Sequence, residues 1–168
     1  FFGDCEKLTG VTIPASVTEI GRAAFSCCKS LKVITLPAGV KSIGDSAFSN
    51  SGIQAIELPE GLETIGSDAF RDCTGLTKLT LPDTVQTLGE GAFYGCYNLQ
   101  TIKLSNNLTE IPEDAFNGDR KLTAITIPEG VTKIGLRAFS DCKTLSAITL
   151  PNNLREIGDS AFYGHSIS

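Results

Sequence analysis

Phenylalanine recurs along this chain at a nearly constant spacing. Consecutive members of the series lie 23 residues apart, except for one step of 22. The series consists of Phe2, Phe25, Phe48, Phe70, Phe93, Phe116, Phe139 and Phe162. A fixed period of this length is typical of a solenoid, in which each repeat buries its apolar face only against its neighbours. The sequence therefore predicts stacked coils whose equivalent side chains lie in columns.

The first half of each repeat predicts a strand. Within residues 8–14, polar residues alternate with β-branched residues, and Pro14 follows directly. Alternation with a period of two predicts a strand with one buried face. Proline cannot donate a backbone hydrogen bond, so it ends the strand. The segment recurs at residues 31–37, 53–59, 76–82, 99–105, 122–128 and 145–151, and Pro closes six of the seven copies.

The second half of the repeat has the pattern Val-x-x-Ile-Gly-x-x-Ala-Phe, as in residues 17–25. Val and Ile three residues apart fit either a short strand or an extended run. Gly follows Ile in six of seven coils, which indicates either a turn with positive φ or a close approach between coils. For the x-x-Ala-Phe stretch we expect one helical turn, with the 3₁₀ form as a candidate.

Two coils depart from the repeat. One residue is missing between Phe48 and Ile53. The coil that begins at Leu99 has no Pro after its strand, has Pro112 in place of Gly, and ends at Asp119 where other coils have Cys. Such departures can mark a functional loop, but we favour drift in a tolerant turn.

Five of the six cysteines follow a Phe by three residues: Cys5, Cys28, Cys73, Cys96 and Cys142. Disulfides, a metal site and a column of free buried thiols are the alternatives, and we favour the column. Parallel Cβ atoms at strand spacing are too far apart for an easy disulfide, and zinc sites favour closely spaced cysteine pairs. The column of Cys27 otherwise holds turn residues, so we expect Cys27 to be exposed and the most reactive thiol.

Composition limits the classes of function. The 168 residues fit a single domain, residues 1–168, and the net charge of −5 argues against a nucleic-acid partner. No run of 18 apolar residues occurs, so we expect no membrane insertion within this segment. The absence of Met and the incomplete coils at both ends predict a fragment of a longer array, with any export signal or anchor outside it.

No catalytic constellation is evident. The only histidine is His165, and neither a nucleophile elbow nor a phosphate-binding loop occurs. Acid pairs such as Glu113-Asp114 are most simply a solvated corner. A parallel β-helix hydrolase or lyase is the enzyme alternative, but such enzymes gather acids and bases on one face, whereas the outward columns here hold Thr and Ala. We expect no enzymatic activity, no cofactor and no metal.

The outward face of the predicted strands is the best candidate for binding. The third and fifth strand positions should point outward, and their charged members cluster near the middle of the array. We expect a binding surface formed by Glu57, Lys78, Thr80, Thr101 and Lys103. The alternative is that Thr recurs only because it favours strands. Ice binding fits less well, because charged residues interrupt the Thr column.

The motif L-x-x-I-x-I-P-x-x-V-x-x-I-G-x-x-A-F-x-x-C, repeated over nearly the whole chain, resembles the BspA-like class of leucine-rich repeats. The resemblance implies a β-rich solenoid: a right-handed superhelix of about seven coils with about 23 residues each. A parallel sheet would form one face and short turns or 3₁₀ segments the opposite face.

The same resemblance implies an extracellular or cell-surface protein that adheres to host or microbial surface proteins or glycans. The family motif consists of core residues, so no binding residues carry over. The alternative function is a structural spacer that displays another domain.

Overall fold

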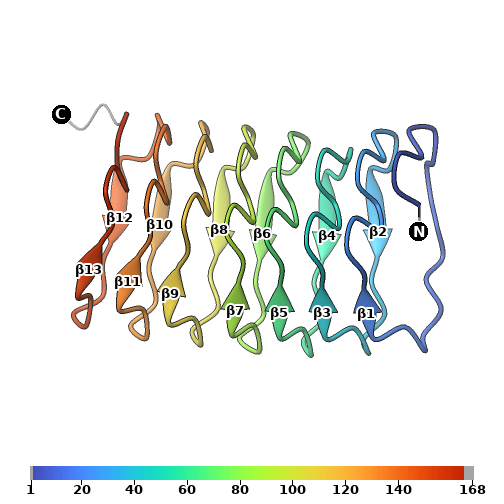
Figure 1. Cartoon of the computed structure of the whole chain (residues 1–168), viewed down its shortest axis with the longest axis horizontal. Coiled ribbons are helices and arrows are strands. Elements are labelled where there is room, and N and C mark those ends of the chain that lie inside the picture. Colours follow the sequence, from blue (N-terminus) through green and yellow to red (C-terminus); the bar gives the residue numbers. More distant parts are fainter. Residues whose placement is uncertain (1, 165–168) are drawn as a thin grey trace.

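The computed structural model describes residues 2–164, which form thirteen parallel-paired strands joined by turns, with no helix in that range (Figure 1). Three-residue strands are β2 (Val33–Thr35), β4 (Ala55–Glu57), β6 (Lys78–Thr80), β8 (Thr101–Lys103), β10 (Ala124–Thr126) and β12 (Ala147–Thr149). Two-residue strands are β1 (Glu19–Ile20), β3 (Ser42–Ile43), β5 (Thr64–Ile65), β7 (Thr87–Leu88), β9 (Glu110–Ile111), β11 (Lys133–Ile134) and β13 (Glu156–Ile157). The second half of each repeat is therefore a short strand.

Equivalent residues of successive coils face one another. The three-residue strands form one row and the two-residue strands a second row (Figure 1). Lys78 of β6 pairs with Thr101 of β8, one repeat later, and Thr80 pairs with Lys103. The predicted β-solenoid is confirmed, with six turns that contain both kinds of strand.

The predicted strand at residues 8–13 does not form. The alternation is present, but Val11 and Ile13 are only half-buried. Within residues 2–164, this segment has a neighbouring coil on one side only. The alternation of polar and apolar residues is therefore not enough by itself to pair this segment with the next strand. Six of the seven predicted long strands form, and the prediction was wrong for the segment at residues 8–13.

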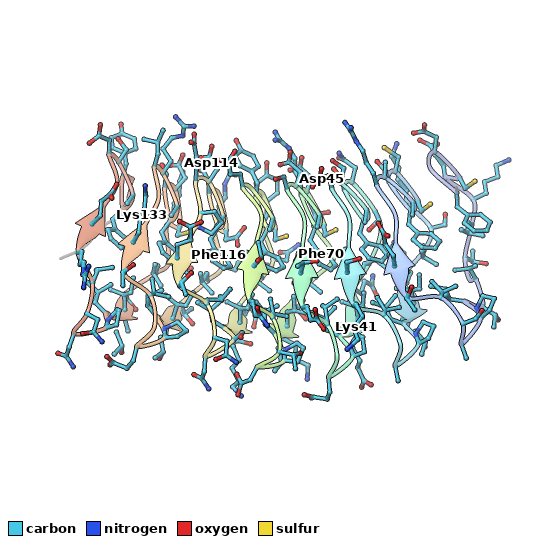
Figure 2. The ribbon with its side chains drawn as sticks, turned by 60° about the horizontal axis from the view of Figure 1, so that its bottom comes forward. Lys41, Asp45, Phe70, Asp114, Phe116 and Lys133 are labelled. Carbon is cyan, nitrogen blue, oxygen red and sulfur yellow. The ribbon has the colours of Figure 1, made fainter. Side chains whose placement is uncertain are left out.

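The phenylalanines form a continuous column inside the array. Neighbouring rings have centroids 5.2–5.6 Å apart and are close to parallel, a spacing typical of offset stacking. Figure 2 shows Phe70 and Phe116 in the interior, with Asp45 and Asp114 at the turn edge. Phe48, Phe70, Phe93, Phe116 and Phe139 are fully buried. The predicted columns of equivalent side chains are confirmed for the phenylalanines.

The predicted helical turn before each Phe is wrong. The residue preceding the Ala adopts positive φ in every coil, as at Ser46 and Asp68, which a right-handed helix does not allow. The reason is hydrogen bonding to the next coil. The N–H groups of Ser46, Phe48 and Asn50 donate to carbonyls of the following coil at 2.7–2.8 Å, so alternate amides point along the solenoid axis and cannot bond within a helix.

The recurrent glycine after Ile is explained by close approach between coils. No glycine of this column has positive φ. A Cβ at Gly89 would lie 2.2 Å from the backbone nitrogen of Ser67 in the preceding coil, whereas a Cβ at Gly21 would meet nothing within 4 Å. The glycines therefore let the backbones of successive coils touch.

Pro112 interrupts one side of the array. At the equivalent position Gly89 donates its N–H to Ile65 at 2.8 Å, and Gly135 donates to Ile111 at 2.7 Å. Proline has no N–H, and the two-residue strands accordingly split into a sheet from β1 to β7 and a second sheet from β9 to β13. The irregular coil therefore leaves a seam between β7 and β9.

We expect the seam to be visible in amide hydrogen exchange. The N–H of Gln86 donates to Glu63, and that of Thr132 donates to Thr109, both at 2.9 Å. Within residues 2–164, the equivalent Thr109 N–H has no backbone acceptor. After correction for intrinsic rates, Thr109 should exchange about tenfold faster or more. Equal protection at all three amides would contradict the seam.

Candidate functional site

The three-residue strands expose alternate side chains. In β2, β4, β6, β8 and β10 the central residue is buried, and the two flanking residues are exposed. Lys78 and Thr80 therefore point outward on either side of Leu79, and Thr101 and Lys103 do the same around Ile102. The predicted orientation of the third and fifth strand positions is confirmed.

A hollow of about 580 Å³ lies on this strand face across β4, β6 and β8. All five residues of the predicted binding surface line it: Glu57, Lys78, Thr80, Thr101 and Lys103. Ile56, Leu79 and Ile102 also contribute, and each is buried except for a small edge. Glu60 is the further charged residue at the hollow. The hollow thus combines an apolar base with hydroxyl and charged groups.

Strand register fixes the arrangement of these groups. Lys78 lies beside Thr101 and Thr80 lies beside Lys103, so the two lysines occupy diagonal corners of a four-residue square. Glu57 comes from β4, the long strand of the preceding coil, which contacts β6 without forming a ladder with it. Glu57 and Lys103 therefore lie on opposite sides of β6, and Lys78 lies on β6 itself, two residues from Thr80.

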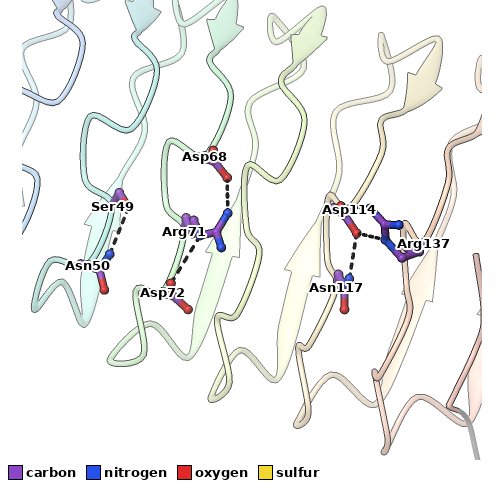
Figure 3. Close-up of polar contacts among 8 residues, drawn as sticks. All are labelled: Ser49, Asn50, Asp68, Arg71, Asp72, Asp114, Asn117 and Arg137. Atoms are coloured by element: carbon purple, nitrogen blue, oxygen red, sulfur yellow. Dashed lines mark hydrogen bonds and ion pairs between the residues drawn. The ribbon is translucent and has the colours of Figure 1, made fainter.

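The charges of the strand face are unpaired, unlike those of the turns. Figure 3 shows Arg71 between Asp68 and Asp72 and Arg137 beside Asp114. The Arg137 side chain lies 2.8 Å from Asp114 and holds the pKa of that carboxyl below its usual range. Among residues 2–164, no ion pair involves Glu57, Lys78 or Lys103. Lys103 adds to the Asn106 backbone hydrogen bond in lowering the pKa of the nearby Asp83 carboxyl, but none of the three charges is held in an ion pair among these residues.

The cysteines are free thiols. The predicted buried column holds for Cys28, Cys73, Cys96 and Cys142, whereas its fifth member, Cys5, is exposed. The Cys73 and Cys96 thiols each donate to the carbonyl of a Phe in an earlier coil at 3.1 Å. Burial raises the pKa of Cys73 to about 11 and raises that of Cys96 as well. Since the thiolate is the nucleophile, such thiols are unreactive at neutral pH. The expectation for Cys27 was wrong in part, because Cys27 is half-buried and Cys5 is the exposed thiol.

Asp119 is a buried carboxyl group that the sequence did not predict. It occupies the column of Cys73, Cys96 and Cys142, is fully buried, and has no hydrogen-bond partner for either carboxylate oxygen. Burial raises its pKa well above the usual range, and the facing Cys96 amide offsets only part of this effect. The only signal in the sequence was the absence of Cys from this coil.

Neither metal-binding nor membrane-spanning features occur in the part of the chain that the structure describes. Residues 2–164 contain no group of three or more His, Cys, Asp or Glu side chains placed to hold a metal ion. The same residues form no helix that is long and apolar enough to cross a bilayer. His165 lies outside the described residues.

Comparisons with known proteins agree with this architecture. The sequence model of the BspA type leucine-rich repeat region matches six copies over residues 1–123 and 109–168. A comparison with curated proteins found no match.

Three solved structures illustrate the similarity. A leucine-rich repeat protein from Bacteroides ovatus is 33% identical, with a TM-score of 0.93 over 98% of this chain and 43% of that one. The T. pallidum leucine-rich repeat protein is 34% identical, with a TM-score of 0.81 over 86% of this chain and 68% of its own. A leucine-rich cell surface protein from Faecalibacterium prausnitzii is 29% identical, with a TM-score of 0.62 over 99% of this chain and 62% of its own. This chain therefore spans less than half of the B. ovatus protein.

The six matched copies together cover the chain from end to end. The chain therefore belongs to the BspA-type leucine-rich repeat family.

Proposed function

We propose that this chain is a non-enzymatic binding module of a cell-surface or secreted protein, and that it adheres to host or microbial surface proteins or glycans through its strand face. The observation that carries the proposal is the hollow across β4, β6 and β8, which gathers Glu57, Lys78 and Lys103 without ion pairs. Exposed strand faces of solenoids are common binding surfaces. The name of the F. prausnitzii relative, a cell surface protein, supports the location.

The double variant Lys78→Glu and Lys103→Glu tests the proposal. The chain is first screened for binding to immobilised matrix proteins and to a glycan array. Reversing both charges should then weaken binding to any ligand found by about tenfold or more, because two favourable contacts become repulsive. Surface plasmon resonance at two salt concentrations measures the change, and the wild-type affinity should also fall with salt.

The matched control is the double variant Lys121→Glu and Lys143→Glu. Both lysines are exposed and neither lines the hollow, so this variant has the same net charge as the test variant. Binding should stay within about twofold of the wild type. Equal affinities for the wild type and the strand-face variant would reject the strand face as the binding surface.

A spacer is the second candidate function, favoured by the unbroken Phe stack from Phe2 to Phe162. A stack of this kind, together with the hydrogen bonds that the Phe amides donate to the next coil, favours a stiff rod. In a longer protein, deleting whole coils would shorten the rod and keep the stacking. If the chain is a spacer that displays another domain, adhesion by that domain should depend on the number of coils. It should not depend on the charges of the strand face.

A further inference from the structure

We infer that the hollow across β4, β6 and β8 binds an extended polypeptide segment in which an acidic side chain and a basic side chain alternate, at positions i and i+2. This inference rests on the proposed function, since it assigns a ligand chemistry to the same surface. It follows from the placement of the charges in the hollow and from the spacing of the strands.

The anionic group of the ligand is recognised by the square on β6 and β8. Lys78 and Lys103 lie at diagonal corners, and the hydroxyl residues Thr80 and Thr101 lie at the other two. Lysine donates up to three hydrogen bonds and threonine one. A carboxylate centred over this square can therefore accept hydrogen bonds from two cations and two hydroxyls.

The cationic group of the ligand is recognised beside the square. Glu57 is exposed on β4 and lines the same hollow, as does Glu60 in the turn that follows. Neither has an ion-pair partner among residues 2–164. Asp83, in the turn after β6, already has a partner, because its carboxylate accepts a hydrogen bond from the Asn106 backbone N–H at 3.0 Å. The acids free for a ligand in the hollow are thus Glu57 and Glu60.

The spacing of these two subsites fits a polypeptide. Adjacent strands lie about 4.8 Å apart, so the centre of the β6–β8 pair is about 7 Å from β4. Side chains on one face of an extended peptide repeat every 6.6–6.8 Å, roughly the same distance. An extended peptide that crosses the strands can therefore place an acid over the square and the next residue on that face beside Glu57.

The acids in the hollow disfavour an acidic polysaccharide. A chain of uniform negative charge would gain from Lys78 and Lys103 but would meet Glu57 and Glu60 with like charge, which costs free energy. A peptide with both signs satisfies both subsites. The apolar base, formed by Ile56, Leu79 and Ile102, adds contact for the aliphatic parts of such side chains.

Binding of defined peptides tests the inference. The probes are the N-acetylated, C-amidated peptides Thr-Asp-Thr-Lys-Thr, Thr-Asp-Thr-Thr-Thr and Thr-Thr-Thr-Lys-Thr, with a hyaluronan tetrasaccharide as the acidic glycan. Titration into the ¹⁵N-labelled chain, read from amide shifts in β4, β6 and β8, gives the affinities. The first peptide should bind about fivefold or more tightly than the others, because each exposed ion pair contributes up to about 1 kcal/mol.

A charge reversal at Glu57 gives the sharpest outcome. Glu57→Lys should remove the preference for the acid–base peptide and strengthen binding of the acid-only peptide, whereas the control Glu19→Lys, exposed on β1, should change neither. Equal binding of the first two peptides, or tighter binding of hyaluronan, would overturn the inference. A matrix protein that depends on Lys78 and Lys103 would still support the proposed function in that case, so the two failures are distinguishable.

Discussion

Gly89→Ala is expected to lower the free energy of unfolding by about 3 kcal/mol, near the upper end of the range for overpacking. The added Cβ would lie 2.2 Å from the Ser67 nitrogen and 2.4 Å from the Gly66 carbonyl carbon. Backbone cannot move aside as a flexible side chain can, so the two coils must separate. For a chain of this size, such a loss lowers Tm by roughly 6–12 °C. Thermal and urea unfolding followed by circular dichroism measure it.

Gly21→Ala is the matched control for this prediction. Gly21 occupies the same column, but its Cβ would meet no atom within 4 Å. Its φ is not positive, so alanine should change stability by less than about 1 kcal/mol. Similar losses for both variants would show that these glycines serve local backbone conformation, and would contradict close approach as their cause.

Asp119→Asn is expected to stabilise the chain, by an amount that grows with pH. Thiols of this column donate to the carbonyl of a Phe in an earlier coil, as Cys142 does to Phe116 at 3.0 Å. The equivalent acceptor for residue 119 is the Phe93 carbonyl, to which an amide N–H can donate. Removing the unpaired carboxyl and adding this bond should contribute about 1–3 kcal/mol, to which the pH-dependent part is added.

The pH dependence follows from the direction of the pKa shift. The pKa of Asp119 is raised in the folded chain by burial, so the folded state keeps a proton that the unfolded chain releases above pH of about 3.9. Stability contributed by this group is therefore complete in acid and is lost as pH rises, by up to about 1.4 kcal/mol per pH unit until the folded group ionises. Cys96 and Cys142, which neighbour it in the column, are neutral over this range because burial raises their pKa values.

Urea unfolding of the wild type and of Asp119→Asn at pH 5, 6, 7 and 8 measures the effect. The difference in the free energy of unfolding should widen with pH. Asp141→Asn is the control for loss of an exposed carboxylate, since Asp141 lies at the surface of a neighbouring turn. A constant difference for Asp119→Asn would show that the folded chain binds no more protons than the unfolded chain between pH 5 and 8, and would contradict a raised pKa of Asp119.

The repeat period made most of the architecture predictable from the sequence. The Phe series set the register, and register alone places Lys78 beside Thr101 and Thr80 beside Lys103. For this reason the five residues expected to share a surface do line one hollow. Whether that hollow binds a partner stays a prediction, as does the extent of the domain over residues 1–168.

The features that could not be predicted depend on contacts between coils. The helical turn predicted before Ala-Phe was wrong because residues as different as Ser46, Asp68 and Arg137 all adopt positive φ there. Alternate N–H groups of this stretch bond to the next coil, which the sequence of one coil does not reveal. The role of Gly89 likewise depends on how near the preceding backbone lies. The seam at Pro112 was visible as an irregularity, but its consequence for β7 and β9 needs the hydrogen-bond pattern.

In-register stacking of successive coils is the premise for both the interior and the binding surface. Scalar couplings through hydrogen bonds test it most directly, in the ¹⁵N,¹³C-labelled chain. The nitrogens of Phe48, Phe70, Phe93 and Phe116 should couple to the carbonyl carbons of Ala69, Ala92, Ala115 and Ala138, to which these amides donate at 2.8–3.0 Å. Couplings to carbonyls shifted along the chain, or bonds only within each coil, would contradict the stacking and with it the shared surface on β4, β6 and β8.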